Sequence, residues 1–81
     1  MDKPAAPAKV TYREQQELKQ LPERIEALEG EQRDLAAKVG GADFYKESAE
    51  AIKFTLDRLS AIETEILEAY ARWNELEERS R

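Results

Sequence analysis

The chain has 81 residues, which is enough for one small domain. Charged residues make up 38% of it and hydrophobic residues 41%, with a formal net charge of -5 at pH 7. Twelve of the hydrophobic residues are alanine, so the side chains available exclude a large globular core. Alanine, glutamate, lysine, leucine and arginine together account for 47 residues, a composition typical of coiled coils and long helices.

Several classes of function are excluded by residue types that the chain lacks. Cysteine and histidine are both absent, which removes disulfides, thiolate nucleophiles, zinc fingers and histidine bases. No apolar run approaches the roughly 20 residues of a membrane helix, and the N-terminus has no signal-peptide pattern. The glutamates have no histidine to complete a metal or acid–base site. We therefore expect a cytoplasmic segment that is not an enzyme, with no catalytic residue, metal, cofactor or membrane partner.

The first ten residues have a different composition from the rest of the chain. Proline and alanine with scattered lysine predict a flexible linker over residues 1–10. This opening fits either a module cut from a longer protein or an ordinary frayed terminus.

A heptad pattern begins at Leu18, and its apolar positions alternate steps of three and four residues. This first seam consists of Leu18, Leu21, Ile25, Leu28, Gln32, Leu35 and Val39. Proline is unfavourable inside a helix but favourable at its first position. The pattern therefore predicts a short helix over residues 11–20, a break or kink at Pro22, and a helix over 22–39. Gly40 and Gly41 are expected to end that helix, because glycine tolerates positive φ.

The connection over residues 40–48 contains Asp43-Phe44-Tyr45, which is expected to form one helical turn. Ser48 is a plausible N-cap for a last helix over residues 49–79. The seam predicted for that helix is Ala49, Ile52, Leu56, Leu59, Glu63, Ile66, Tyr70, Trp73 and Glu77. Beside this seam lie Ile62, Leu67 and Leu76.

The lengths of these segments predict how they pack. At 1.5 Å per residue the last helix is about 46 Å long, and the first arm is about 42 Å when residues 11–20 are included. The fold class predicted is all-α: an antiparallel coiled-coil helical hairpin. Residues whose numbers sum to roughly 88 are expected to pair, so that Val10 and Tyr12 cover Trp73 and Leu76. A monomer is expected, with a four-helix dimer as the alternative.

Charge is uneven along this hairpin. Residues 1–32 carry a net charge of -2 and residues 59–81 a net charge of -3, whereas residues 33–58 at the tip are neutral. The acidic end of the hairpin, opposite the tip, repels phosphate, so nucleic acid would bind at the tip or at the lysine-bearing linker. The candidate nucleic-acid-binding residues are Arg33, Lys38, Lys46, Lys53 and Arg58. The alternative is a solvated surface of mixed charge.

Three aromatic residues near the tip are candidates for contacting a partner. Phe54 takes an outward heptad position, and Phe44 and Tyr45 lie in the connecting loop. They form either a partner-binding tip or a cover over the loop and one another.

Several short stretches resemble the C-terminal domain of the ABC-F ATPases. They are Lys9-Val-Thr-Tyr-Arg-Glu-Gln-Gln-Glu-Leu18, Leu21-Pro22, Ile25-Glu-Ala-Leu-Glu29, Ala42-Asp-Phe-Tyr45 and Ala69-Tyr-Ala-Arg-Trp-Asn-Glu-Leu-Glu77. They occur in the family's order and extend over about residues 9–78. Members of this family are soluble, carry two ATP-binding cassettes and act on the ribosome. Their appended domain is described as a coiled-coil hairpin associated with DNA binding.

The resemblance implies a non-catalytic accessory domain that binds DNA, or structured RNA, through backbone electrostatics. Its implied partners are DNA, ribosomal RNA and the ATPase core of the same chain. ATP and magnesium would belong to that core, since this segment has no Walker motif. The alternative is a protein-interaction or spacer hairpin that contacts the ATPase core or the ribosome without binding nucleic acid.

Overall fold

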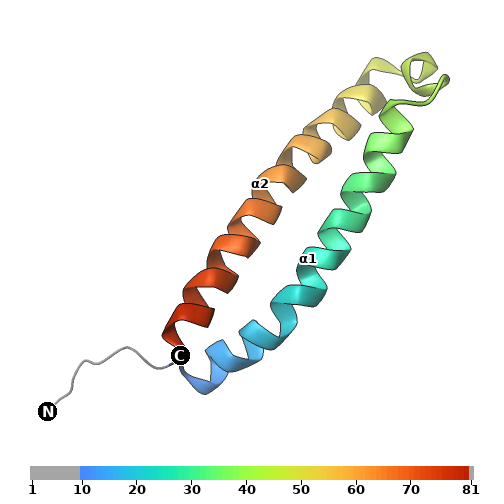
Figure 1. The fold of residues 1–81 in the computed structure, drawn as a ribbon. Coiled ribbons are helices and arrows are strands. Elements are labelled where there is room, and N and C mark those ends of the chain that lie inside the picture. Colours follow the sequence, from blue (N-terminus) through green and yellow to red (C-terminus); the bar gives the residue numbers. More distant parts are fainter. Residues whose placement is uncertain (1–9, 81) are drawn as a thin grey trace, which may run out of the picture.

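The computed structural model describes residues 10–80, which form an antiparallel pair of long helices. Helix α1 spans Tyr12–Val39, a short 3-10 turn η1 spans Phe44–Lys46, and helix α2 spans Ala49–Arg79. Figure 1 shows the two helices side by side, with the connection at one end and the start of α1 and the end of α2 at the other. The predicted all-α hairpin is confirmed. The predicted linker lies outside the described residues, except for Val10.

Helix α1 starts with a capping box that the sequence pattern Thr-x-x-Glu encodes. The Thr11 hydroxyl accepts a hydrogen bond from the backbone N–H of Glu14 at 3.1 Å. The Glu14 carboxylate accepts one from the backbone N–H of Thr11, also at 3.1 Å. Each side chain satisfies a backbone donor that the first helical turn leaves free.

The predicted break at Pro22 is wrong, because α1 runs through it without interruption. The φ angle of proline suits a helix, so the ring costs the backbone one hydrogen bond and some steric strain. Pro22 is exposed, whereas Leu21 and Ile25 beside it are buried against α2. We attribute the continuity of the helix to this burial, which compensates for the lost bond. A kink at this position stays a prediction.

The connection between the helices is short and ordered. The predicted turn after Asp43 is confirmed as η1, and Ser48 caps α2 by accepting a hydrogen bond from the Ala51 N–H at 3.1 Å. The expectation that glycine ends α1 through a positive φ is wrong, since Gly40 has a φ of -79°. Instead, the Gly40 N–H donates to the Ala36 carbonyl at 3.0 Å, which continues the helical pattern for one more residue.

One buried residue per heptad marks the side of α2 that packs on α1. These residues are Thr55, Ile62, Ala69 and Leu76. The opposing positions of α1 are Leu21, Ile25 and Leu28. A core this narrow needs few large side chains, because each helix buries a single stripe.

The buried stripe of α2 is displaced by one residue from the predicted seam. Leu56 and Tyr70 were expected at its centre, but they are 40% and 39% exposed. Glu63 and Glu77, which had to be treated as polar exceptions within the seam, lie at exposed positions. The displaced stripe thus contains no charged residue.

The predicted register is confirmed by ion pairs between the helices. Residue numbers sum to 89 in the pairs Arg24–Glu65, Arg58–Glu31 and Arg72–Glu17. At the open end, Val10, Leu18 and Trp73 pack against the core cluster that contains Leu76. Tyr12 is 76% exposed, so its predicted role in covering Trp73 is wrong. Neither described helix is long and apolar enough to cross a membrane.

Candidate nucleic-acid interface

The closed end of the hairpin presents three exposed lysines. Lys38 lies in the last turn of α1, Lys46 ends η1, and Lys53 lies in the first turns of α2. Their side chains are 48%, 78% and 76% exposed. The turn η1 positions Lys46 between the ends of the two helices. The tip therefore gathers positive charge from three separate elements.

Each tip lysine is within reach of one carboxylate. Lys38 Nζ lies 3.9 Å from Glu47, and Lys46 Nζ lies 3.3 Å from Asp43. Lys53 Nζ donates a hydrogen bond of 2.7 Å to Asp57 one turn further along α2. Exposed pairs of this kind contribute at most about 1 kcal/mol, so a phosphate oxygen can replace the carboxylate at low cost.

Arg33 is exposed on α1, six residues before the helix ends at Val39. It forms no ion pair with any other residue in the range 10–80. Its guanidinium is therefore available to a phosphate without displacing another charge.

Arg58 has a different role from the other candidate cations. It donates to both oxygens of Glu31 across the hairpin, from Nε at 2.8 Å and from Nη2 at 2.9 Å. A third bond, from Nη1 to Glu65 at 2.9 Å, leaves the side chain only 33% exposed. These carboxylates raise the pKa of Arg58, and the arginine lowers the pKa of Glu31. The geometry makes Arg58 a clamp between the helices.

The fold buries one of the three candidate aromatic residues and leaves the other two exposed. Phe44 is 2% exposed, so its predicted part in a partner-binding tip is wrong. The turn η1 folds its ring over the end of the hairpin, where Tyr45 meets it edge to face at a centroid distance of 4.8 Å. Tyr45 and Phe54 are 66% and 75% exposed.

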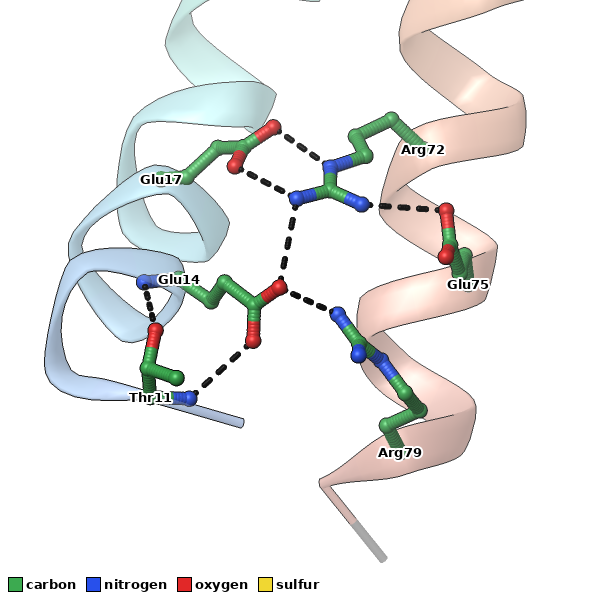
Figure 2. Close-up of polar contacts among 6 residues, drawn as sticks. All are labelled: Thr11, Glu14, Glu17, Arg72, Glu75 and Arg79. Carbon is green, nitrogen blue, oxygen red and sulfur yellow. Dashed lines mark hydrogen bonds and ion pairs between the residues drawn. The ribbon is translucent and has the colours of Figure 1, made fainter. Parts of the chain in front are cut away.

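The sequence reasoning missed a polar network at the open end of the hairpin, which Figure 2 shows. Its centre is Arg72 on α2. Arg72 donates to both oxygens of Glu17 on α1, from Nε at 2.7 Å and from Nη2 at 3.0 Å, and to Glu75 on its own helix at 3.1 Å. A planar guanidinium that binds a carboxylate through two donors fixes the relative position of the helices.

The same network reaches the first turn of α1 through Glu14. One carboxylate oxygen of Glu14 accepts from Arg79 and faces Arg72 Nη2 at 3.5 Å, while the other completes the capping box (Figure 2). The Thr11 N–H and then Arg79 lower the pKa of Glu14, and Arg72 lowers that of Glu17. The Thr-x-x-Glu pattern signals the cap, and the register signals the cross-helix pairs.

The described residues offer no metal centre. No three acidic side chains between residues 10 and 80 are placed so that they could hold a metal ion together. A hollow of about 570 Å³ does lie between the helices near Leu21, lined partly by Arg24, Arg72 and Glu17. Arg24 and Arg72 already form ion pairs with Glu65 and Glu17 across the two helices. The hollow is therefore a groove crossed by ion pairs.

Comparison with known proteins identifies a matching family and relatives of similar sequence. A model of the ABC transporter C-terminal domain matches residues 9–78. The ATP-binding protein Uup-like of Haemophilus influenzae is 37% identical over 71 residues, which is 88% of this chain. The ATP-binding protein Uup of Escherichia coli K12 is 36% identical over 70 residues, or 86% of this chain. The chain spans only 16% and 11% of these two relatives.

A solved structure of the C-terminal domain of Uup superposes closely on the hairpin. The TM-score is 0.82 at 34% sequence identity, and the match covers 86% of this chain and 82% of the other. That domain is described as a DNA-binding coiled-coil motif. The coiled coil seen here is thus shared with a relative of clear sequence similarity.

Proposed function

Because the chain belongs to the ABC transporter C-terminal domain family, we propose that it is a non-catalytic accessory domain that binds DNA. The observation that carries the proposal is its likeness to the Uup domain described as a DNA-binding coiled coil, with a TM-score of 0.82. The exposed cations near the tip suit phosphate oxygens, and the contact that we propose is with the phosphate backbone, without reading of bases.

The contact surface proposed is the tip, defined as Lys38, Lys46 and Lys53 together with Arg33. These side chains are exposed, and their carboxylate partners are exposed too. Arg58 is left out, because a phosphate would have to displace two carboxylates that already bind it. The acidic open end faces away from the DNA, since it lies at the far end of both helices (Figure 1).

A salt titration tests the electrostatic mechanism. Fluorescence anisotropy with a short labelled duplex gives the affinity at each salt concentration. The logarithm of the affinity falls with the logarithm of salt by about 0.9 per phosphate contacted, so contacts from the four tip cations predict a slope of about -3.6. An affinity that does not change with salt would contradict the proposal.

Charge reversal tests the position of the surface. Lys46→Glu should weaken DNA binding and reduce the salt slope, whereas Lys19→Glu, an exposed lysine near the open end of α1, is a control with the same change in net charge. Equal losses in both variants would mean that net charge governs binding and that the tip is not the interface. The triple reversal of Lys38, Lys46 and Lys53 should abolish binding.

The wider setting of the domain is also a proposal. Its relatives are ATP-binding proteins several times its length, and we place this hairpin beside an ATPase core in the same chain. That core would hold ATP and magnesium and would act in the cytoplasm. The hairpin itself closes its own core, which supports a monomer. Structured RNA, including ribosomal RNA, offers the same phosphates, and competition with duplex DNA distinguishes the two.

A second function is favoured by the exposure of Phe54 and Tyr45 at 75% and 66%. Under this alternative the hairpin contacts the ATPase core or the ribosome through protein, without nucleic acid. Phe54→Ser would then abolish the contact while leaving DNA affinity unchanged. Binding through these rings would depend little on salt, which separates it from the phosphate mechanism.

A further inference from the structure

Helix α2 carries a second apolar stripe beside the one that packs on α1. Leu56, Leu67 and Tyr70 are 40%, 70% and 39% exposed. With Glu63 they follow steps of seven, four and three residues, which places all four on one side of the helix. We name this set the outer stripe. Helix α1 buries the neighbouring line through Ile62 and reaches the outer stripe at Tyr70, whose hydroxyl donates to Glu29. The apolar surface of the outer stripe is therefore only partly covered within residues 10–80.

A hollow of about 300 Å³ lies in the middle of this stripe. It is lined by Gln32, Glu63, Ile66 and Leu67. Two walls are therefore aliphatic, and the others carry a carboxylate and an amide. This combination suits a lysine or arginine, whose methylene stem lies along apolar surface while its charge reaches a polar group.

Glu63 is the acidic residue near the hollow whose carboxylate is available to pair with such a cation. Glu29, on the neighbouring part of α1, accepts a hydrogen bond from the Tyr70 hydroxyl at 3.0 Å. Glu77 accepts one from the Trp73 indole at 3.2 Å. Glu63 forms no hydrogen bond or ion pair between side chains with any other residue that the structure describes. Its exposed carboxylate is thus free to pair with a cation that a partner brings.

The charges argue against two other occupants. A second copy related by a twofold axis would pair Leu56 with Tyr70, and this register would set Glu63 against its own counterpart. Each copy also carries a net charge of -5. A nucleic acid would bring phosphates to the same carboxylate. Both are therefore opposed by repulsion at the centre of the stripe.

We propose that the outer stripe docks an amphipathic helix of another polypeptide segment, with a lysine or arginine at the centre of its apolar face. The apolar residues of that helix would cover Leu56, Leu67 and Tyr70, in the helix-in-groove mode. Its cation would enter the hollow and pair with Glu63. This contact is separate from the tip and does not depend on DNA binding.

A synthetic peptide serves as the probe. It has about 20 residues, which is long enough to form a helix, with leucines spaced to match the outer stripe and one lysine at its centre. A second peptide, the glutamate twin, is identical except that glutamate replaces this lysine. Amide NMR titration of the chain should move signals at Leu56, Glu63 and Leu67 and leave Lys46 unmoved. The glutamate twin should bind at least roughly tenfold more weakly, because like charges would then meet. Shifts at the tip, or no shifts with the lysine peptide, overturn the proposal.

Variants of the chain complete the test. Glu63→Lys should reverse the preference between the two peptides, and Leu67→Gln should weaken both. Glu23→Lys is the matched control, because Glu23 is exposed between buried Leu21 and Ile25 and so lies on the far side of α1. An unchanged preference in Glu63→Lys overturns the pairing. Self-association of the chain in sedimentation equilibrium, abolished by Leu67→Gln, would assign the stripe to a second copy and also overturn the proposal.

Discussion

Replacing Leu76 with alanine tests the packing at the open end of the hairpin. Leu76 is 0% exposed and belongs to a cluster with Leu21, Ile25 and Ala69. Burying a leucine side chain contributes about 1.5–3 kcal/mol, and the cavity left by alanine raises the cost to about 3–5 kcal/mol. Domains of 81 residues have unfolding free energies of only about 4–12 kcal/mol. The variant should therefore lose a large part of its stability.

Urea unfolding followed by circular dichroism measures this loss. Leu67→Ala is the matched control, because it makes the same chemical change on the same helix at a position that is 70% exposed. It should cost less than about 0.5 kcal/mol. A loss below about 1 kcal/mol in Leu76→Ala would mean that Val10 and Leu18 do not cover this leucine. Equal losses in the two variants would refute the assignment of the buried stripe.

Three further predictions concern α1. Pro22→Ala restores a backbone donor inside the helix and should raise the free energy of unfolding in urea by up to about 3 kcal/mol; a decrease would show that the open end needs a proline kink. Thr11→Ala removes the cap and should cost about 1 kcal/mol in the same assay, with Thr11→Ser as the control that keeps it. Lowered pKa values of Glu14, Glu17 and Glu31 mean that the folded state releases these protons more readily, so thermal stability should be full above pH 4.5 and fall as pH drops below it. Replacing the three glutamates with glutamine should flatten that profile, and an unchanged profile would contradict the pairing.

The hairpin and its register could be predicted from spacing alone. Heptads on either side of Gly40 and Gly41 indicate two helices, and the similar lengths of the two arms favour one antiparallel alignment. The alignment was correct to within a residue, because the sum of 88 was replaced by 89 in three cross-helix pairs. The loop position depends on local chemistry, which a sequence displays directly, whereas the continuity of α1 through Pro22 does not follow from local chemistry.

The buried side of α2 could not be predicted with the same accuracy. Its apolar residues fill two adjacent stripes, one through Ile62 and one through Leu56, and both satisfy a heptad pattern. The choice depends on which stripe matches α1 in volume. Thr55 and Ala69, which are small, occupy the buried stripe, because close contact between the helices leaves little room there. A count of large hydrophobic residues favours the stripe through Leu56, which is not the buried one.

Some features of the candidate site could be predicted from the sequence and others could not. Exposure of Lys46 and Lys53 follows from their position near a turn, and it could be predicted. The commitment of Arg58 to Glu31 could not, since the pair joins residues 27 positions apart and depends on side-chain geometry as well as register. Burial of Phe44 follows from the path of a three-residue turn, for which the sequence has no periodic signal.

The net charge of -5 is a poor guide to what the hairpin can bind, because the excess of acidic residues lies in residues 1–32 and 59–81, while residues 33–58 at the tip are neutral. Glu14, Glu17 and Glu31 are bound by arginines of α2, and these pairs hold the arms together. Their charge is largely neutralised at short range, so it contributes little to the field at the tip, which lies beyond a Debye length from the open end. At the tip the lysines have only exposed, exchangeable partners. A phosphate there meets a locally available positive charge, although the whole chain is acidic.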